Sequence, residues 1–143
     1  MTKNVRSAQA RWVEGKEFDV VTGSGHHVVL DAAEKAGGKN RGASPMEHLL
    51  VGLAGCTGMD VIDILKKKRQ DVSGLEVRVE GTRSEDTPAV YTHIHIKYVV
   101  RGKNIAPEAV ARAIHLSETK YCSVGAMLGK TAKIKTSFEI VAA

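Results

Sequence analysis

Two cysteines are the residues of this 143-residue chain best suited to chemistry, and their local sequences differ. Cys56 lies within the apolar, glycine-rich stretch "SPMEHLLVGLAGCTGMDVIDILKKK", and Cys122 lies within "KYCSVGAMLGK". A thiolate is a nucleophile that can be oxidised reversibly, whereas a buried thiol behaves as a small apolar side chain. The sequence therefore leaves two interpretations of the pair, redox chemistry or simple burial.

The local sequence predicts that Cys122 ionises more easily than Cys56. Cys122 stands at or just before an expected helix start, where unpaired amide groups and the nearby Lys120 favour a thiolate. Cys56 lies twelve residues into a helix, beyond the reach of the helix dipole. If Cys56 is the nucleophile, a cation or donor from elsewhere in the fold must stabilise its thiolate. Neither feature identifies which cysteine attacks.

Glu47 precedes Cys56 by nine positions, so the two side chains point about 180° apart around one helix. We therefore expect Glu47 to cap the helix with Ser44 rather than to assist Cys56, unless it meets the Cys56 of a partner chain.

His93 and His95 lie two positions apart on an expected strand, a spacing that can bind a metal ion. No third ligand is evident, so we interpret them as exposed strand histidines and predict no metal site. The sequence also lacks a glycine-rich phosphate motif, a nucleophile-elbow serine and a dinucleotide fingerprint.

The elements that must position the thiols follow from the pattern of apolar residues and turn signals. Alternation from Val5 to Asp31 predicts three antiparallel strands, and residues 32–43 form a glycine-rich loop. Ser44, Pro45 and Glu47 predict a capped helix that runs to about Lys68. We expect two further strands (Leu75–Arg83 and Val90–Arg101), two helices (Pro107–Lys120 and Cys122–Lys130) and a final strand (Ala132–Val141) to follow. The second of these strands alternates, so that Val90 and Tyr98 share one face while Tyr91 and His93 share the other. The order βββαββααβ indicates an α+β fold.

Glycine is unusually frequent around Cys56. Gly52, Gly55 and Cys56 form a strip of small residues, and each internal glycine costs roughly 0.5 to 1 kcal/mol relative to alanine. We expect the cost to be offset by close approach of a second copy of this helix in a dimer, or of a substrate.

Length, charge and hydropathy restrict the number of domains, the partners and the location of the protein. The length suits a single domain over residues 1–143, and the net charge of +5 comes from scattered lysines and arginines without base-stacking aromatic residues. We therefore predict no nucleic-acid partner. The N-terminus has no apolar run of the kind found in signal peptides, and no window approaches about 18 apolar residues, so we predict a cytoplasmic protein without a membrane span.

The two cysteine motifs together carry a family resemblance. "SPMEHLLVGLAGCTGMDVIDIL" and "SETKYCSVGAML" resemble the OsmC/Ohr family of osmotically induced and organic hydroperoxide resistance proteins, and the element order agrees along nearly the whole chain. The similarity is greatest to the OsmC-like subgroup with GGCTxMD and KYCSV motifs. The resemblance implies antiparallel sheets wrapped around long central helices in an intertwined homodimer.

The resemblance also implies a function. Cys56 would attack the O–O bond of an organic hydroperoxide and become a sulfenic acid, and Cys122 would resolve it to a disulfide. A dithiol reductant, such as a reduced lipoyl protein, would restore the thiols without a metal or organic cofactor. An alternative is an OsmC-like binding protein that holds a small apolar or thiol-reactive molecule without peroxidase turnover.

The sequence departs from the hydroperoxidase pattern at two places. The family places glutamate directly after the helix-opening proline, where this chain has Met46, and Glu47 follows one residue later. The family also uses an arginine in a loop between the first strands, whereas "VEGKEF" contains Lys16. The group that activates Cys56 is therefore left open among Glu47, Arg11, Arg41 and a partner-chain residue.

Overall fold

Three short antiparallel strands form the sheet of the first part of the chain. The computed structural model describes residues 4–143, and internal contacts divide the chain into two units, Met1–Leu49 and Leu50–Ala143. The first unit contains β1 (Ala8–Glu14), β2 (Glu17–Thr22) and β3 (His27–Leu30), paired in that order, and one turn of 3-10 helix at Glu34–Ala36. This confirms the predicted strands, while the single domain stays a prediction.

The glycine-rich loop after β3 is organised by a buried carboxylate. Asp31 accepts hydrogen bonds from the backbone N–H groups of Ala32 at 2.7 Å, Arg41 at 3.1 Å and Lys39 at 3.3 Å. These donors, led by the N–H of Ala32, lower the pKa of Asp31. A Cβ at Gly38 would lie 2.1 Å from the carbonyl oxygen of Ala32, so the loop requires glycine there.

Helix α1 (Pro45–Lys67) begins with the predicted capping box. The Ser44 N–H donates to Glu47 Oε1 at 2.9 Å, and the Glu47 N–H donates to Ser44 Oγ at 3.2 Å. The same contacts with Ser44 lower the pKa of Glu47. At the other end, Arg69 adopts a left-handed conformation with φ of 58°, and the Gln70 N–H donates to the Leu65 carbonyl at 3.0 Å. Both ends of α1 are therefore closed by local hydrogen bonds.

The second unit contains a three-stranded mixed sheet. Its strands are β4 (Asp71–Arg83), β5 (Tyr91–Lys103) and β6 (Lys133–Ala142), in the order β4-β5-β6. β4 and β5 are antiparallel, but β6 runs parallel to β5, which corrects the expectation of purely antiparallel sheets. The reason is the connection: α2 (Pro107–Leu116) and α3 (Ser123–Leu128) carry the chain back before β6 begins, as a parallel pair requires.

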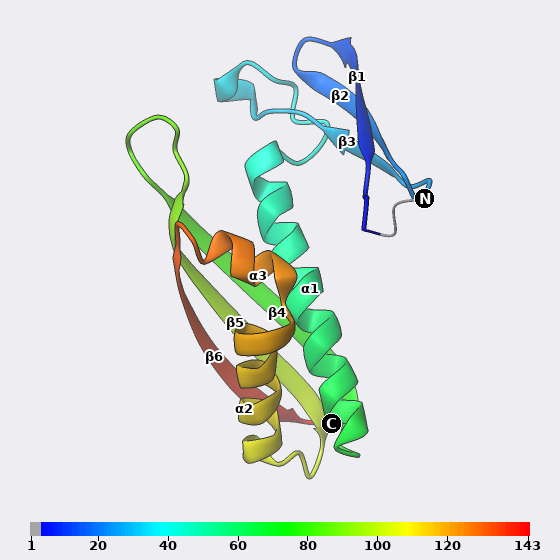
Figure 1. The fold of residues 1–143 in the computed structure, drawn as a ribbon, viewed down its shortest axis with the longest axis vertical. Coiled ribbons are helices and arrows are strands. Elements are labelled where there is room, and N and C mark those ends of the chain that lie inside the picture. Colours follow the sequence, from blue (N-terminus) through cyan, green and yellow to red (C-terminus); the bar gives the residue numbers. More distant parts are fainter. Residues whose placement is uncertain (1–3) are drawn as a thin grey trace. The chain divides into compact units, whose positions relative to one another are not determined.

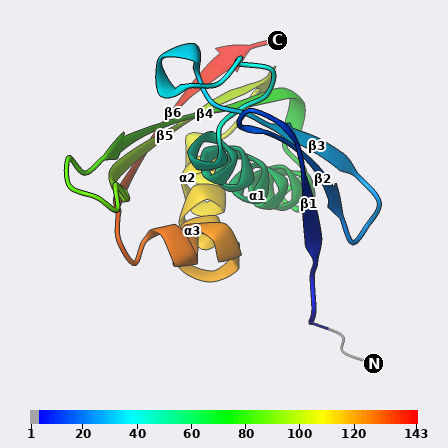
Figure 2. The same cartoon turned by 90° about the horizontal axis from the view of Figure 1, so that it is seen from above.

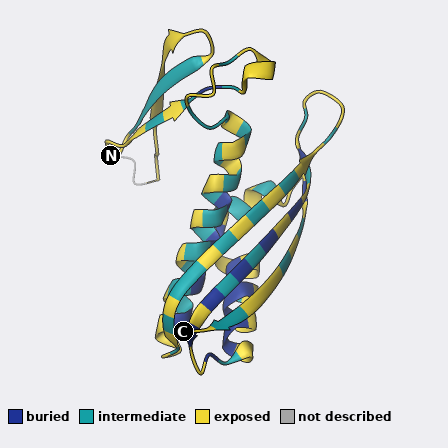
Figure 3. Cartoon of the chain, turned by 180° about the vertical axis from the view of Figure 1, so that it is seen from behind, coloured by how far each residue is buried: buried dark blue, intermediate teal, exposed yellow. Residues whose placement is uncertain are grey.

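The helices lie on one face of this sheet (Figure 1), and a view turned by 90° shows the same arrangement (Figure 2). Buried residues alternate along β5 and recur every four residues along α1, and Figure 3 shows them as dark blue segments. They are Ile94, Ile96, Tyr98 and Val100 on β5, and Leu53, Thr57, Val61 and Leu65 on α1. The core of the second unit therefore lies between β5 and this face of α1.

The start of β5 differs from the expected alternation. Tyr91 is 5 % exposed, although the pattern placed it on the outer face with His93, and Val90 is 39 % exposed. The register between β4 and β5 shifts between Thr82 and Arg83, which turns Tyr91 toward the core. Gly81 provides the space, because a Cβ there would lie 2.7 Å from the Tyr91 ring.

By length and composition alone, α1 can cross a membrane, with a mean hydropathy of 1.5 over its most apolar window. This corrects the expectation that no stretch reaches this length. Core helices of water-soluble proteins meet the same criterion, and one face of α1, with Leu53, Val61 and Leu65, is buried. The cytoplasmic location stays a prediction.

The capping box makes a testable contribution to stability. Ser44→Ala removes the side-chain acceptor for the Glu47 N–H, and we expect the free energy of unfolding to fall by about 1 kcal/mol. Urea unfolding followed by circular dichroism measures the change. Ser44→Thr keeps the acceptor and serves as the control, and an equal loss in both variants would contradict the capping role.

Candidate thiol site

The structure brings the two cysteines together, although they lie 66 positions apart in the sequence. Cys56 is half-buried in the middle of α1, and Cys122 is 6 % exposed directly before α3. Both are free thiols, and Cys56 lies near enough to Cys122 to raise its pKa. Such an arrangement allows a disulfide to form between Cys56 and Cys122 once one sulfur is oxidised.

Cys122 owes its position to a change in helix geometry. The sequence predicted one helix from Pro107 to Lys120, but α2 ends at Leu116 and a wider π-helical turn follows over Ser117–Tyr121. In this turn the Cys122 N–H donates to the Ser117 carbonyl, five residues earlier, at 2.8 Å. Cys122 then caps α3, since its Sγ accepts the Gly125 N–H at 3.3 Å. Turns of this kind are frequent at functional sites.

Burial raises the pKa of Cys122 to about 11, which makes the prediction of an easily ionised Cys122 wrong. The Gly125 N–H opposes this shift, and the nearby Cys56 adds to it. The sequence argument recognised the helix start but not the desolvation of the thiol, which has the larger effect here. Cys122 is therefore almost entirely a neutral thiol at neutral pH.

A chain of buried hydroxyl groups runs beside the two thiols. The hydroxyl oxygens of Thr57 and Tyr98 are 2.6 Å apart, those of Thr57 and Ser117 are 2.8 Å apart, and Ser117 donates to Asp60 Oδ2 at 2.9 Å. Because each hydroxyl has one proton, Ser117 must accept from Thr57, and Thr57 must accept from Tyr98. We call this one-directional series, Tyr98 to Thr57 to Ser117 to Asp60, the hydroxyl chain.

The sequence analysis did not single out the hydroxyl chain. Thr57 and Asp60 follow Cys56 closely within "GCTGMD", and this was the one sign in the sequence that they belong to the site. Tyr98 was correctly placed on the inner face of its strand, but nothing in the sequence showed which hydroxyl it meets. Burial raises the pKa of Tyr98 to about 12, so the phenol stays protonated and can donate to Thr57.

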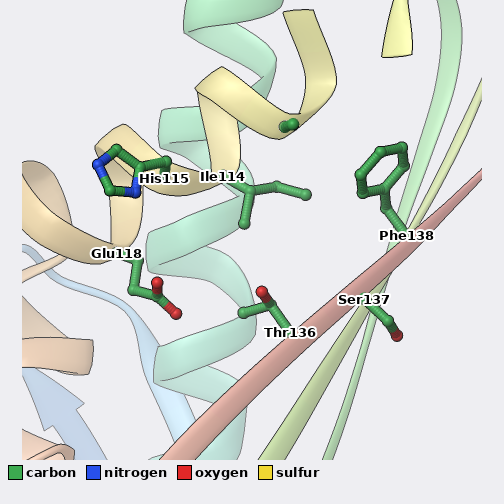
Figure 4. Close-up of a pocket in the computed structure, with 7 residues that line it drawn as sticks. Ile114, His115, Glu118, Thr136, Ser137 and Phe138 are labelled. Carbon is green, nitrogen blue, oxygen red and sulfur yellow. The ribbon is translucent and has the colours of Figure 1, made fainter. Parts of the chain in front are cut away.

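Cys122 lines a small hollow, and a larger hollow lies next to it. The smaller, the thiol pocket, has a volume of about 40 Å³ and an outer hollow has about 370 Å³. Cys122, Thr57 and Tyr98 line the thiol pocket, whereas His115 and Phe138 line the outer hollow (Figure 4). Glu118 and Thr136 line both, so the two hollows are neighbours.

The sequence candidates for activating Cys56 all have partners within the first unit. Glu47 belongs to the capping box, and an exposed ion pair joins Arg11 to Asp19 at 3.5 Å. Arg41 approaches two carboxylates on one side of the first sheet, those of Glu17 at 3.5 Å and Glu14 at 3.6 Å. Lys16, which replaces the arginine of the hydroperoxidase pattern, donates to the Ala36 carbonyl at 2.6 Å.

The strand histidines make ordinary polar contacts. His95 Nε2 lies 2.9 Å from Ser137 Oγ, and His93 Nδ1 lies 3.1 Å from Thr92 Oγ1. Within residues 4–143, no group of three or more histidine, cysteine, aspartate or glutamate side chains is arranged to hold a metal ion.

Fold, cysteine pair and sequence together define the class of this protein. The family model described as OsmC-like protein matches residues 37–137, and the chain belongs to this family. The chain has the α+β fold of OsmC/Ohr proteins, with the predicted order βββαββααβ.

Individual relatives agree with this assignment. Protein YhfA of Escherichia coli (strain K12) is 42% identical over 136 residues, covering 95% of this chain and 98% of that protein. A hypothetical protein from Aquifex aeolicus VF5 is similar in structure, with a TM-score of 0.86, 36% identity and 98% coverage of both chains. An organic hydroperoxide resistance protein OsmC from Legionella pneumophila has a TM-score of 0.72 at 12% identity, covering 97% of this chain and 99% of that one. At 12% identity the likeness shows the fold alone.

The raised pKa of Cys122 predicts its reactivity. We expect iodoacetamide to label Cys122 in the native protein much more slowly than in urea at about pH 8, with a native rate that rises toward pH 11, because the thiolate is the reactive form. Peptide mass spectrometry measures the label at each cysteine.

A control variant separates the causes of this effect. Cys56→Ser removes the neighbouring thiol that raises the pKa of Cys122, so labelling of Cys122 should become faster at a given pH. Equal labelling of Cys122 in native and unfolded wild-type protein would contradict the burial of its thiol.

Proposed function

We propose that this protein is a thiol peroxidase that reduces organic hydroperoxides, with Cys56 as the attacking and Cys122 as the resolving cysteine. The observation that carries the proposal is that the fold brings two free thiols, 66 positions apart in the sequence, close enough for Cys56 to raise the pKa of Cys122. Family membership supports it, because structural neighbours are named organic hydroperoxide resistance proteins.

The proposed cycle needs three steps. The Cys56 thiolate attacks the hydroperoxide, so that an S–O bond forms, the O–O bond breaks and an alcohol leaves with a proton. Cys122 then attacks the Cys56 sulfenic acid, forming the disulfide and releasing water. A dithiol reductant, such as a reduced lipoyl protein, restores both thiols by two thiol–disulfide exchanges.

Burial supports this division of roles. The Cys122 thiol is buried and its pKa is about 11, so the thiolate that must attack a peroxide is scarce at neutral pH. Cys56 is more accessible than Cys122 on the described surface. Resolution is less demanding, because a sulfur held next to a sulfenic acid reacts within one molecule.

A binding protein without turnover is the second candidate. The observation that favours it is that Glu47, Arg11 and Arg41, the candidates within the chain for activating Cys56, each have a partner in the first unit. In this alternative, a cleft that the dimer would form beside Cys56 holds a small apolar or thiol-reactive molecule.

Mass spectrometry after peroxide treatment distinguishes the two functions. One equivalent of cumene hydroperoxide should convert the reduced protein to a form 2 Da lighter that carries the Cys56–Cys122 disulfide, because loss of two thiol hydrogens costs about 2 Da. Cys56→Ser should abolish peroxide consumption, whereas Cys122→Ser should consume one equivalent and stop at the sulfenic acid. Undiminished consumption by Cys56→Ser would exclude the peroxidase, and an adduct on freshly purified protein without turnover would favour binding.

We further propose that the outer face of α1 packs against a second copy of the chain. Val51 is 61 % and Met59 is 73 % exposed, and between them a Cβ at Gly55 would meet nothing within 4 Å. These residues lie about one turn apart and form one apolar stripe with a small residue at its centre. Two such helices can approach closely at Gly55, and their contact would remove the stripe from water.

A charge placed in this stripe tests the dimer. We expect Met59→Glu to shift the protein from dimer to monomer in size-exclusion chromatography with light scattering, because the interface would bury an unpaired carboxylate. Lys130→Glu, an exposed change outside α1, is the control and should leave the mass unchanged. A monomeric wild type at micromolar concentration would refute the proposed dimer.

A further inference from the structure

The hydroxyl chain joins the two cysteine-bearing segments through one residue. Ser117 Oγ accepts from Thr57 and donates to Asp60, which stand one and four positions after Cys56 on α1. The carbonyl of the same residue accepts the N–H of Cys122. Ser117 therefore holds α1 by its side chain and Cys122 by its backbone.

The hydroxyl chain is fully satisfied only when every link is present. Tyr98, Thr57 and Ser117 are at most 2 % exposed, so each of these hydroxyl groups depends on its partners in the chain. Their protons point in one direction and end on the carboxylate of Asp60, which is the strongest acceptor of the series. Removing the Thr57 hydroxyl would leave the Tyr98 donor and a Ser117 lone pair unpaired, and the Ser117 hydroxyl would then be joined to α1 through Asp60 alone.

We propose that the hydroxyl chain positions Cys122 beside Cys56 in the reduced protein and thereby favours and accelerates formation of the Cys56–Cys122 disulfide. Tyr98, Thr57, Ser117 and Asp60 act as positioning residues and do not react. The inference deepens the proposed peroxidase function, because it concerns the second step of that cycle.

The hydroxyl chain assists the second step of the proposed cycle, in which the disulfide forms. The Cys122 sulfur attacks the sulfur of the Cys56 sulfenic acid, the S–S bond forms and the S–O bond breaks. Hydroxide leaves and takes the Cys122 proton to become water. The Cys122 sulfur is oxidised and the sulfenic sulfur is reduced, and the hydroperoxide of the first step is the only oxidant.

A matched pair at Thr57 tests the proposal. Thr57→Val keeps the branched shape without the hydroxyl, and Thr57→Ser keeps the hydroxyl without the methyl group. Each reduced protein is equilibrated in buffers of reduced and oxidised glutathione, alkylated, and weighed to give the disulfide fraction. We expect Thr57→Val to lower the equilibrium constant for the disulfide at least about tenfold, and Thr57→Ser to retain it within about twofold.

The equilibrium constant separates positioning from general stability. A merely structural contact would destabilise the reduced and disulfide forms equally and leave the constant unchanged. That result in Thr57→Val, or an equal fall in Thr57→Ser, would overturn the proposal. If Thr57→Val fails to fold, Asp60→Ala removes the half-buried end of the hydroxyl chain and should lower the constant in the same way.

A kinetic measurement keeps the two proposals distinguishable. With hydroperoxide and dimedone, Thr57→Val should accumulate the Cys56 sulfenic adduct, while the rate of sulfenic acid formation in a Cys122→Ser background should not change. A failure of Cys122→Ser to form any sulfenic acid would refute the peroxidase. The glutathione equilibrium needs no peroxidase activity and would still decide whether the hydroxyl chain positions the thiols.

Discussion

The burial of Ser117 is the constraint on which the thiol site depends. Its hydroxyl is fully buried and contacts two residues of α1, while its carbonyl accepts the backbone of Cys122. A buried hydroxyl must be paired, and here the partners lie on the segment that carries Cys56. Satisfying one polar group therefore fixes how α1, β5 and the turn before Cys122 meet, since Tyr98 of β5 completes the same series.

The same burial determines what each thiol can do. The environment that accommodates Ser117 and Tyr98 also desolvates Cys122 and raises its pKa to about 11. A thiol in this state is unsuited to meet a peroxide from solution, but it needs no high nucleophilicity if its target is the adjacent sulfur. In the proposed cycle, the position of Cys122 next to Cys56, and not its ionisation, is the source of its reactivity. For this reason, a buried second cysteine is consistent with redox chemistry and is not evidence of a merely structural residue.

Local sequence patterns predicted the helices and strands well, but they predicted the tertiary contacts between them poorly. The capping box at Ser44 and Glu47 and the alternation along β5 depend on neighbours in sequence, and the structure confirms both. The parallel pairing of β6, the inward turn of Tyr91 and the π-helical turn at Ser117 depend on residues far away in the chain. The prediction of an easily ionised Cys122 was wrong for the same reason. The helix start can be recognised from neighbouring residues, whereas the burial that raises the pKa depends on distant parts of the chain. The hydroxyl chain combines four residues from three elements, which no periodicity reveals.

Packing within one chain does not explain the glycines around Cys56. Added Cβ atoms would make only ordinary contacts at Gly52, 3.9 Å from Val124, and at Gly58, 3.4 Å from Val77, and none at Gly55. No described part of the chain therefore needs glycine at these positions, although each costs roughly 0.5 to 1 kcal/mol relative to alanine. Gly55 lies on the exposed stripe with Val51 and Met59, where a second helix could approach more closely than any side chain would allow. The glycines of the helix that holds Cys56 thus support the proposed interface with a second copy of the chain.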